Sequence, residues 1–207
     1  MSKRLRGVFF MGIVMILLIA IASDNFALKP VRKHLIDTKQ RGPDGSKYHN
    51  KTFVVVNVVD GDTFDIDIPD GESDITRIRP LGIDTPETKH PDIPEMYYGR
   101  QAFEHTEGLL KGNTVTIIID TEGKSRDIYG RLLCYVQLSD GRDFSRVMIE
   151  DGYAYADLRF EHSRYEQYAD YQQQAIENQA GLWKEVSVDQ LPKWLRQRSP
   201  NILENMN

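Results

Sequence analysis

Two short groups of acidic residues in this sequence have the chemistry of a site for a hard metal ion. Asp60 and Asp62 flank Gly61 between two predicted strands, where an Asp-Gly pair taken alone indicates an ordinary hairpin turn. Asp84 and Glu87 lie close together directly after a third predicted strand. Calcium and magnesium prefer oxygen ligands, and a bound ion allows several acids to crowd together. The two groups together therefore predict a cation site.

Two arginines could extend this site to phosphate chemistry. Arg79 lies on the predicted strand that precedes Asp84, and Arg131 closes a turn at 127–131. Single arginines on strands usually lie on solvated surface, but two beside a carboxylate–metal cluster would form a planar, bidentate phosphate clamp. The metal would polarise a phosphoryl oxygen, a carboxylate would orient or deprotonate water, and the arginines would stabilise charge growing on phosphorus.

The elements that must position these residues follow from the hydrophobic pattern. Five segments have the β-branched or alternating composition of strands: 53–59, 63–68, 74–83, 114–119 and 131–138. Three segments have the apolar stripe of a helix: 98–111, 144–150 and 163–180. One helix lies between the third and fourth strands, and the others follow the fifth. This order predicts an α+β, mainly β fold, a five-stranded OB-fold barrel with added helices.

The N-terminus has the pattern of an export signal. A basic start is followed by an uncharged, mostly apolar run over 8–22 that ends in a small-x-small triplet. The run is shorter than the ~20 residues that span a bilayer, so we favour a cleaved signal peptide over an uncleaved membrane anchor. We expect a secreted or extracytoplasmic protein with four parts: signal peptide or anchor 1–22, flexible tether 23–50, catalytic domain 51–185 and C-terminal tail 186–207.

Charge and cysteine usage exclude several classes of function. Without residues 1–22 the chain would hold 23 basic and 31 acidic residues, a net charge of −8, which is not the balance of a protein that holds DNA by charge alone. Cys134, the single cysteine, lies in an apolar run and is expected to be a buried structural thiol. The five histidines have no zinc-ligand spacing.

In their order and nearly in their spacing, several parts of the chain resemble the motifs of the staphylococcal (micrococcal) nuclease family. These parts are 60–63, Arg79, 84–91, 127–131 and 181–183. No single motif decides the matter, but the ordered set is very specific. The resemblance extends from about residue 51 to about residue 184.

The resemblance implies a calcium-dependent nuclease that cleaves DNA and RNA with little sequence preference and leaves 3′-phosphates. Asp62 and Asp84 would bind Ca²⁺ through their side chains, and Thr85 through its backbone carbonyl. Glu87 would act as general base or orient the attacking water, and Asp60 would support the metal ligands from behind. We expect DNA and RNA as substrates and a monomeric protein.

The resemblance also implies how the substrate is held. Arg79 and Arg131 would hold the scissile phosphate, while Tyr129 and Lys89 would contact the substrate. The family prototype has one basic residue and two tyrosines near the bound nucleotide, and the residues here at those places are Ile128, Leu158 and Phe160. We therefore expect an intact catalytic set with weaker nucleotide affinity.

Two other classes of protein remain open from the sequence. OB-fold barrels often bind without chemistry, so a non-catalytic nucleic-acid-binding module is one alternative, although it would be expected to lack part of the acidic and arginine set. An envelope-tethered interaction protein, with an uncleaved anchor and an acidic contact surface, is the other. A nuclease assay with and without calcium tests the first, and release of the mature protein tests the second.

Overall fold

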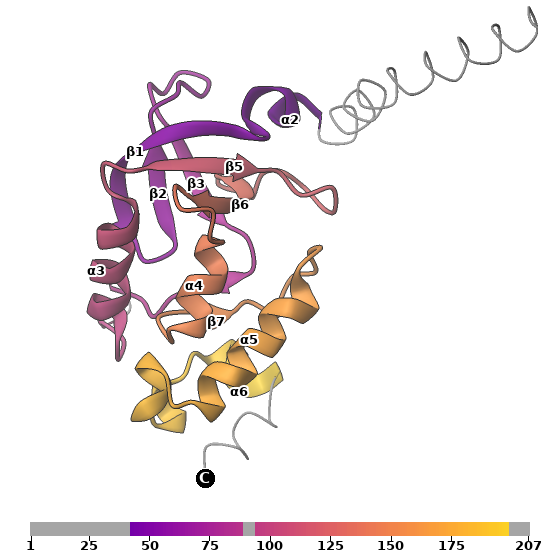
Figure 1. The fold of residues 1–207 in the computed structure, drawn as a ribbon. Coiled ribbons are helices and arrows are strands. Elements are labelled where there is room, and N and C mark those ends of the chain that lie inside the picture. Colours follow the sequence, from indigo (N-terminus) through magenta and orange to yellow (C-terminus); the bar gives the residue numbers. More distant parts are fainter. Residues whose placement is uncertain (1–41, 89–93, 199–207) are drawn as a thin grey trace, which may run out of the picture.

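The computed structural model describes residues 42–88 and 94–198 (Figure 1). The predicted signal peptide, most of the predicted tether and Lys89 lie outside these residues. Within the described ranges, no helix has the length and apolar composition needed to cross a membrane.

A closed five-stranded barrel forms the centre of the fold and confirms the predicted OB-fold. Its strands are β1 (Lys51–Asp60), β2 (Thr63–Ile66), β3 (Thr76–Pro80), β5 (Thr114–Ile118) and β6 (Leu132–Leu138). They are hydrogen-bonded in the order β1-β2-β3-β6-β5, and β1 and β5 close the barrel with antiparallel pairing. β3 and β6 are parallel, with Ile78 opposite Leu132.

Alternation of side chains along the strands separates the core from the site. On β3, Thr76, Ile78 and Pro80 are buried, whereas Arg77 and Arg79 point outward on one face, as predicted. The single cysteine, Cys134, is fully buried on β6, which confirms its predicted structural place. Burial raises the pKa of the Cys134 thiol, which removes the thiolate that reactive cysteines need.

The third predicted strand is divided, and the prediction of one continuous strand over 74–83 is wrong. β3 ends at Pro80, and β4 (Ile83–Asp84) pairs instead with β7 (Tyr155–Ala156). Between them Gly82 has φ +74°, and a Cβ there would lie 2.5 Å from the Tyr168 ring. The chain therefore leaves the barrel at Gly82 and carries Asp84 towards the C-terminal helices.

Three helices confirm the predicted helical segments. They are α3 (Gly99–Leu110), α4 (Phe144–Glu150) and α5 (Tyr165–Glu177). The Asp143 side chain caps α4 by accepting the Ser145 N–H. In Figure 1, α3 lies beside the barrel, and α4 and α5 lie at the end away from α2 (Gly42–Tyr48).

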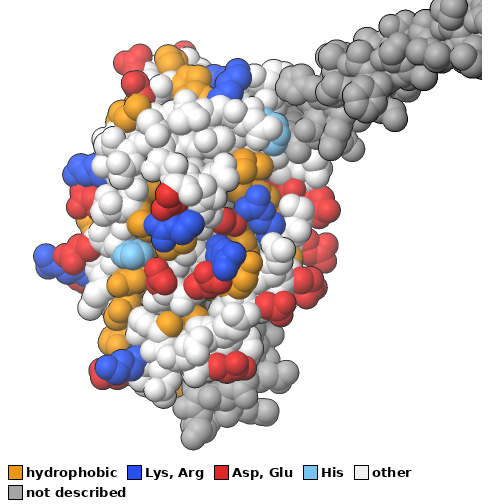
Figure 2. All heavy atoms as spheres, in the orientation of Figure 1, with side chains coloured by type: hydrophobic (Ala, Val, Ile, Leu, Met, Phe, Trp, Pro, Cys, Tyr) orange, Lys and Arg blue, Asp and Glu red, His pale blue; other side chains and the backbone are white. Residues whose placement is uncertain are grey.

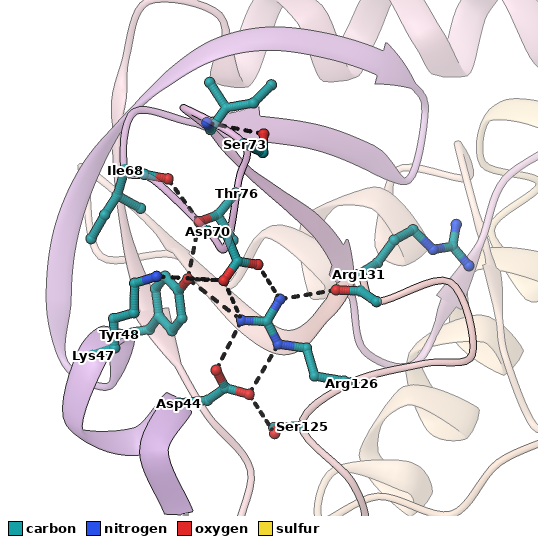
Figure 3. Close-up of polar contacts among 12 residues, drawn as sticks. Asp44, Lys47, Tyr48, Ile68, Asp70, Ser73, Thr76, Ser125, Arg126 and Arg131 are labelled. Atoms are coloured by element: carbon teal, nitrogen blue, oxygen red, sulfur yellow. Dashed lines mark hydrogen bonds and ion pairs between the residues drawn. The ribbon is translucent and has the colours of Figure 1, made fainter.

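The folded unit extends beyond both predicted domain boundaries. At the N-terminal side, α2 replaces the end of the predicted tether, with Tyr48 fully buried. Asp44 on this helix accepts two hydrogen bonds from Arg126, which also binds Asp70 and the Gly130 carbonyl (Figure 3). This partly buried charge network links residues 42–48 to the barrel through charge-assisted hydrogen bonds between one guanidinium and two carboxylates.

The predicted C-terminal tail is also folded. It contains the 3-10 helix η2 (Val188–Gln190) and the helix α6 (Lys193–Arg198), and it follows the 3-10 helix η1 (Gly181–Lys184) at the end of the predicted catalytic domain. α6 and η2 give the tail regular structure. Its apolar residues Val186, Leu191 and Leu195 enter a second buried cluster, which also contains Tyr155, Ile176, Leu182 and Trp183.

Candidate active site

The turn between β1 and β2 is packed directly against the loop that follows β4. Asp62 Oδ2 accepts the backbone N–H of Thr85 at 2.9 Å, so the two acidic groups of the sequence meet. A Cβ on Gly61 would lie 2.7 Å from Thr85 Oγ1. Glycine is therefore required at residue 61 for close approach of the two segments, which is a different reason from the hairpin turn that an Asp-Gly pair suggests.

Asp60 ties these two segments together from the other side. Its Oδ1 accepts the Gly61 N–H and the Thr88 hydroxyl, each at 2.8 Å. Burial raises the pKa of Asp60, and the neighbouring Glu87 carboxylate raises it further, while the bonds from Thr88 and Gly61 oppose the shift. Asp60 and Glu87 are thus close enough for their charges to interact, and Glu87 Oε1 accepts the Thr88 N–H at 3.1 Å.

Arg79 joins the two carboxylates that the sequence predicts as metal ligands. Its Nη2 donates to Asp84 Oδ1 at 2.9 Å and to the Ile83 carbonyl at 3.2 Å, and its Nη1 contacts the Asp62 carboxylate. The Arg79 side chain is only 15% exposed. Burial lowers the pKa of Arg79, Asp84 opposes this, and the positive charge of Arg131 adds to it. The two arginines of the predicted phosphate clamp are therefore within electrostatic reach of each other.

The donor set fits a calcium ion held by few protein ligands. Across residues 42–88 and 94–198 no cluster of three or more His, Cys, Asp or Glu side chains is arranged to hold a metal. The prediction needs only two carboxylates, Asp62 and Asp84, and these converge on one cation, the guanidinium of Arg79. Asp62 contacts Nη1 and Asp84 contacts Nη2 of this guanidinium, so both carboxylates face the same positive charge. Water or substrate oxygens would complete the coordination of an ion held by so few protein ligands.

A tight turn at 127–131 presents Arg131. Asp127 Oδ1 accepts the backbone N–H groups of Tyr129 and Arg131, both at 2.9 Å, and its Oδ2 accepts Arg131 Nε at 2.5 Å. Gly130 has φ +79°, which closes the turn without a side-chain clash. Among the described residues, nothing hydrogen-bonds the terminal Nη groups of Arg131, and Figure 3 shows this side chain pointing away from the Arg126 network. Asp127 therefore fixes the Nε side of the guanidinium, and the Nη groups remain for another ligand.

The three departures from the prototype lie in different environments. Ile128 is 91% exposed and Phe160 is 66% exposed, whereas Leu158 packs against the core. Tyr129 is also exposed, with the Arg131 guanidinium 5.4 Å from its ring centre. Arg126 cannot replace the missing cation at residue 128, because its Nη2 is bound to Asp44 and its Nη1 is bound to Asp70.

Two residues at the site were missed from the sequence. Arg159 Nη2 lies 3.1 Å from Asp84 Oδ1, and Trp194 Nε1 donates to Asp84 Oδ2 at 2.9 Å. Arg159 lies between Leu158 and Phe160, which the resemblance places near the nucleotide, so its position in the sequence could have indicated a place at the site. Trp194 lies in the predicted tail, and no local pattern connects it with Asp84.

The fold and these contacts define an OB-fold protein with a carboxylate–guanidinium cluster suited to a cation and a phosphate. A family model described as staphylococcal nuclease homologue matches residues 77–185. The chain belongs to this family.

Individual relatives agree with this assignment. The chain is similar to a thermonuclease of Staphylococcus intermedius, with 32% identity over 187 residues, 89% of this chain and 99% of that protein. A thermonuclease of Staphylococcus hyicus is 33% identical over 140 residues, 67% of this chain and 79% of that protein. Endonuclease YncB of Bacillus subtilis is 30% identical over 151 residues, 70% of this chain and 69% of that protein.

Proposed function

We propose that this protein is an exported, calcium-dependent nuclease that hydrolyses DNA and RNA with little sequence preference and leaves 3′-phosphates. The observation that carries the proposal is the convergence of Asp62 and Asp84 on Arg79, with Glu87 and Arg131 nearby. Membership of a nuclease family supports the reaction class. Export rests on the basic start and apolar run of residues 1–22.

The residues divide the chemistry between them. Asp62, Asp84 and the Thr85 carbonyl would hold calcium, which supplies positive charge to the phosphoryl oxygens when it is bound. Glu87 orients a water and takes its proton as the water oxygen bonds to phosphorus. The bond from phosphorus to the 5′-oxygen then breaks, the 5′-oxygen takes a proton from solvent and leaves as a hydroxyl, and the phosphate stays on the 3′ side. Arg79 and Arg131 stabilise the charge that accumulates on the phosphoryl oxygens during this step.

Digestion of single-stranded DNA, duplex DNA and RNA in calcium or in chelator tests the proposed function. We expect cleavage of all three substrates in calcium, none in chelator, and products whose 3′ ends carry phosphate. A protein that binds these polymers without cleaving them would instead be a non-catalytic OB-fold module. Cleavage that is equal in chelator would contradict the calcium requirement.

We predict that the protein binds calcium weakly in the absence of substrate. Two carboxylates and one carbonyl form a poor cage beside an EF-hand, so we expect a Kd of about 10⁻⁴ to 10⁻³ M. The buried Arg79 also neutralises the two carboxylates, which lowers their attraction for a second cation. Calorimetry on the substrate-free enzyme measures this value. Sub-micromolar affinity would show that the ligand set is incomplete.

Ile128→Lys is predicted to lower KM and to make it more sensitive to salt, with kcat nearly unchanged. The exposed side chain at residue 128 can carry a cation without repacking. Each added phosphate contact contributes about 0.9 to the salt slope on duplex DNA. Figure 2 shows acidic and basic side chains mixed on the face that it draws. Ile128→Gln is the uncharged control.

The alternative explanation for residue 128 is that Ile128 simply lies in a loop remote from the nucleotide. Unchanged KM and salt slope in Ile128→Lys would support that explanation. An equal decrease in KM for the lysine and glutamine variants would show that loss of the apolar side chain, rather than gain of charge, is responsible.

A further inference from the structure

The C-terminal segment is held firmly against the β4–β7 pair. Val186, Leu191 and Leu195 are each less than one-tenth exposed and pack in the second buried cluster. Ser187 and Gln190 form a reciprocal capping box at η2. The position of α6 is therefore fixed by burial and by backbone capping, so a side chain on this helix can define the geometry of its contacts.

Trp194 uses this fixed position to reach Asp84. Its indole Nε1 donates to Asp84 Oδ2 at 2.9 Å. Its ring meets Tyr155 edge-on at 6.4 Å between centroids, and the Arg159 guanidinium lies 4.5 Å from its centre. Packing on two sides leaves the indole little freedom, so the direction of its N–H is set before any ligand arrives.

The other oxygen of Asp84 is held by arginines. Oδ1 accepts Arg79 Nη2 at 2.9 Å and lies 3.1 Å from Arg159 Nη2. Arg159 is itself fixed by two bonds to Asp157, at 2.7 and 2.9 Å. Asp157 is buried, and its N–H donates to the Gly82 carbonyl. Without a donor on Oδ2, the two cations on Oδ1 would dominate the orientation of this carboxylate.

We propose that Trp194 is a positioning residue that orients the Asp84 carboxylate for a divalent cation. This inference rests on the proposed function, because it takes Asp84 as a calcium ligand. A carboxylate oxygen can accept two partners, so the indole N–H fixes Oδ2 without using up its capacity as a ligand. Removal of a hydrogen bond that orients a metal ligand typically weakens metal affinity by 10- to 100-fold. Folding of the C-terminal segment and completion of the cation site are thereby linked.

Trp194→Phe tests the proposal because it removes the N–H and keeps a ring for Tyr155 and Arg159. Calcium that binds only the folded protein raises its unfolding temperature by an amount set by concentration relative to Kd. For each protein, the unfolding temperature is compared with its own value without calcium. We expect Trp194→Phe to need about 10- to 100-fold more calcium than wild type for the same increase in unfolding temperature. The calcium concentration that gives half-maximal cleavage should increase by the same factor, and kcat should recover at saturating calcium.

Trp183→Phe is the matched control. Trp183 is the only other tryptophan in the chain, is buried in the same cluster, and contacts Tyr155 at 5.7 Å. Its calcium dependence should equal that of wild type. Equal calcium dependence in Trp194→Phe and wild type, or loss of kcat that calcium does not restore, would overturn the positioning role. If calcium stabilises wild type but no cleavage is seen, the proposed function fails while the cation site stands; absence of both effects overturns both.

Discussion

Replacement of Arg131 by lysine is expected to lower kcat by about 10²-fold or more, nearly as much as replacement by alanine. Lysine keeps the positive charge but loses the planar fork that spans two phosphoryl oxygens. The structure adds a second reason, because Arg131 Nε is already bound to Asp127 at 2.5 Å. A lysine ammonium would have only one group to divide between Asp127 and the phosphate.

Single-turnover kinetics on a defined oligonucleotide measure this effect. KM should change less than kcat, since the bidentate contact matters most as charge develops. Arg142→Lys is the control, because Arg142 lies on an exposed turn and pairs with Asp140. Near-wild-type turnover by Arg131→Lys would refute the bidentate role and leave Arg131 as a simple point charge.

Glu87→Gln is expected to lower kcat by about 10² to 10⁴-fold, the range in which a general base contributes. The amide has the same shape and its oxygen can still accept the Thr88 N–H, so the loop should keep its place. What is lost is the proton acceptor and the negative charge beside Asp60.

Calcium-dependent stabilisation separates the roles that Glu87 could have. A base that does not bind the metal can be replaced without changing the increase in unfolding temperature produced by calcium. If Glu87→Gln abolishes that increase, Glu87 is a ligand and the division of roles proposed above is wrong. Glu104→Gln, on an exposed ion pair of α3, controls for the loss of one acidic charge.

The barrel was predictable because its determinants are local. Alternation on β3 placed Arg77 and Arg79 on one face, and the order of strands and helices defined the OB-fold. The break after Pro80 was not predictable, because it depends on close packing of Gly82 against residues far along the chain. For the same reason the sequence predicts a tether at α2, because the attachment of this helix depends on Arg126, which is distant in sequence from Asp44.

The site was predictable where residue types repeat a known order, and not where a single tertiary contact adds a residue. Asp62, Arg79 and Asp84 meet as expected, and those contacts are direct. Trp194 comes from a polar segment whose periodicity gives no sign of burial. The buried side chains of Val186, Leu191 and Leu195 nevertheless hold this segment at Asp84. Sequence patterns report which face of an element is buried, but they do not report which distant element covers it.

The isolated thiol of Cys134 has a practical consequence for measuring how often the barrel opens. With one cysteine in the chain, neither an internal disulfide nor a second reactive thiol complicates alkylation. The side chain lies within the β3–β6 ladder opposite Pro80, so a reagent reaches it only when strands separate. The rate of alkylation therefore reports how often the native barrel opens transiently, and it can be measured without denaturant. Comparing the alkylation rate with and without calcium would show whether ion binding slows transient opening of the whole barrel or acts only on the loops around the site.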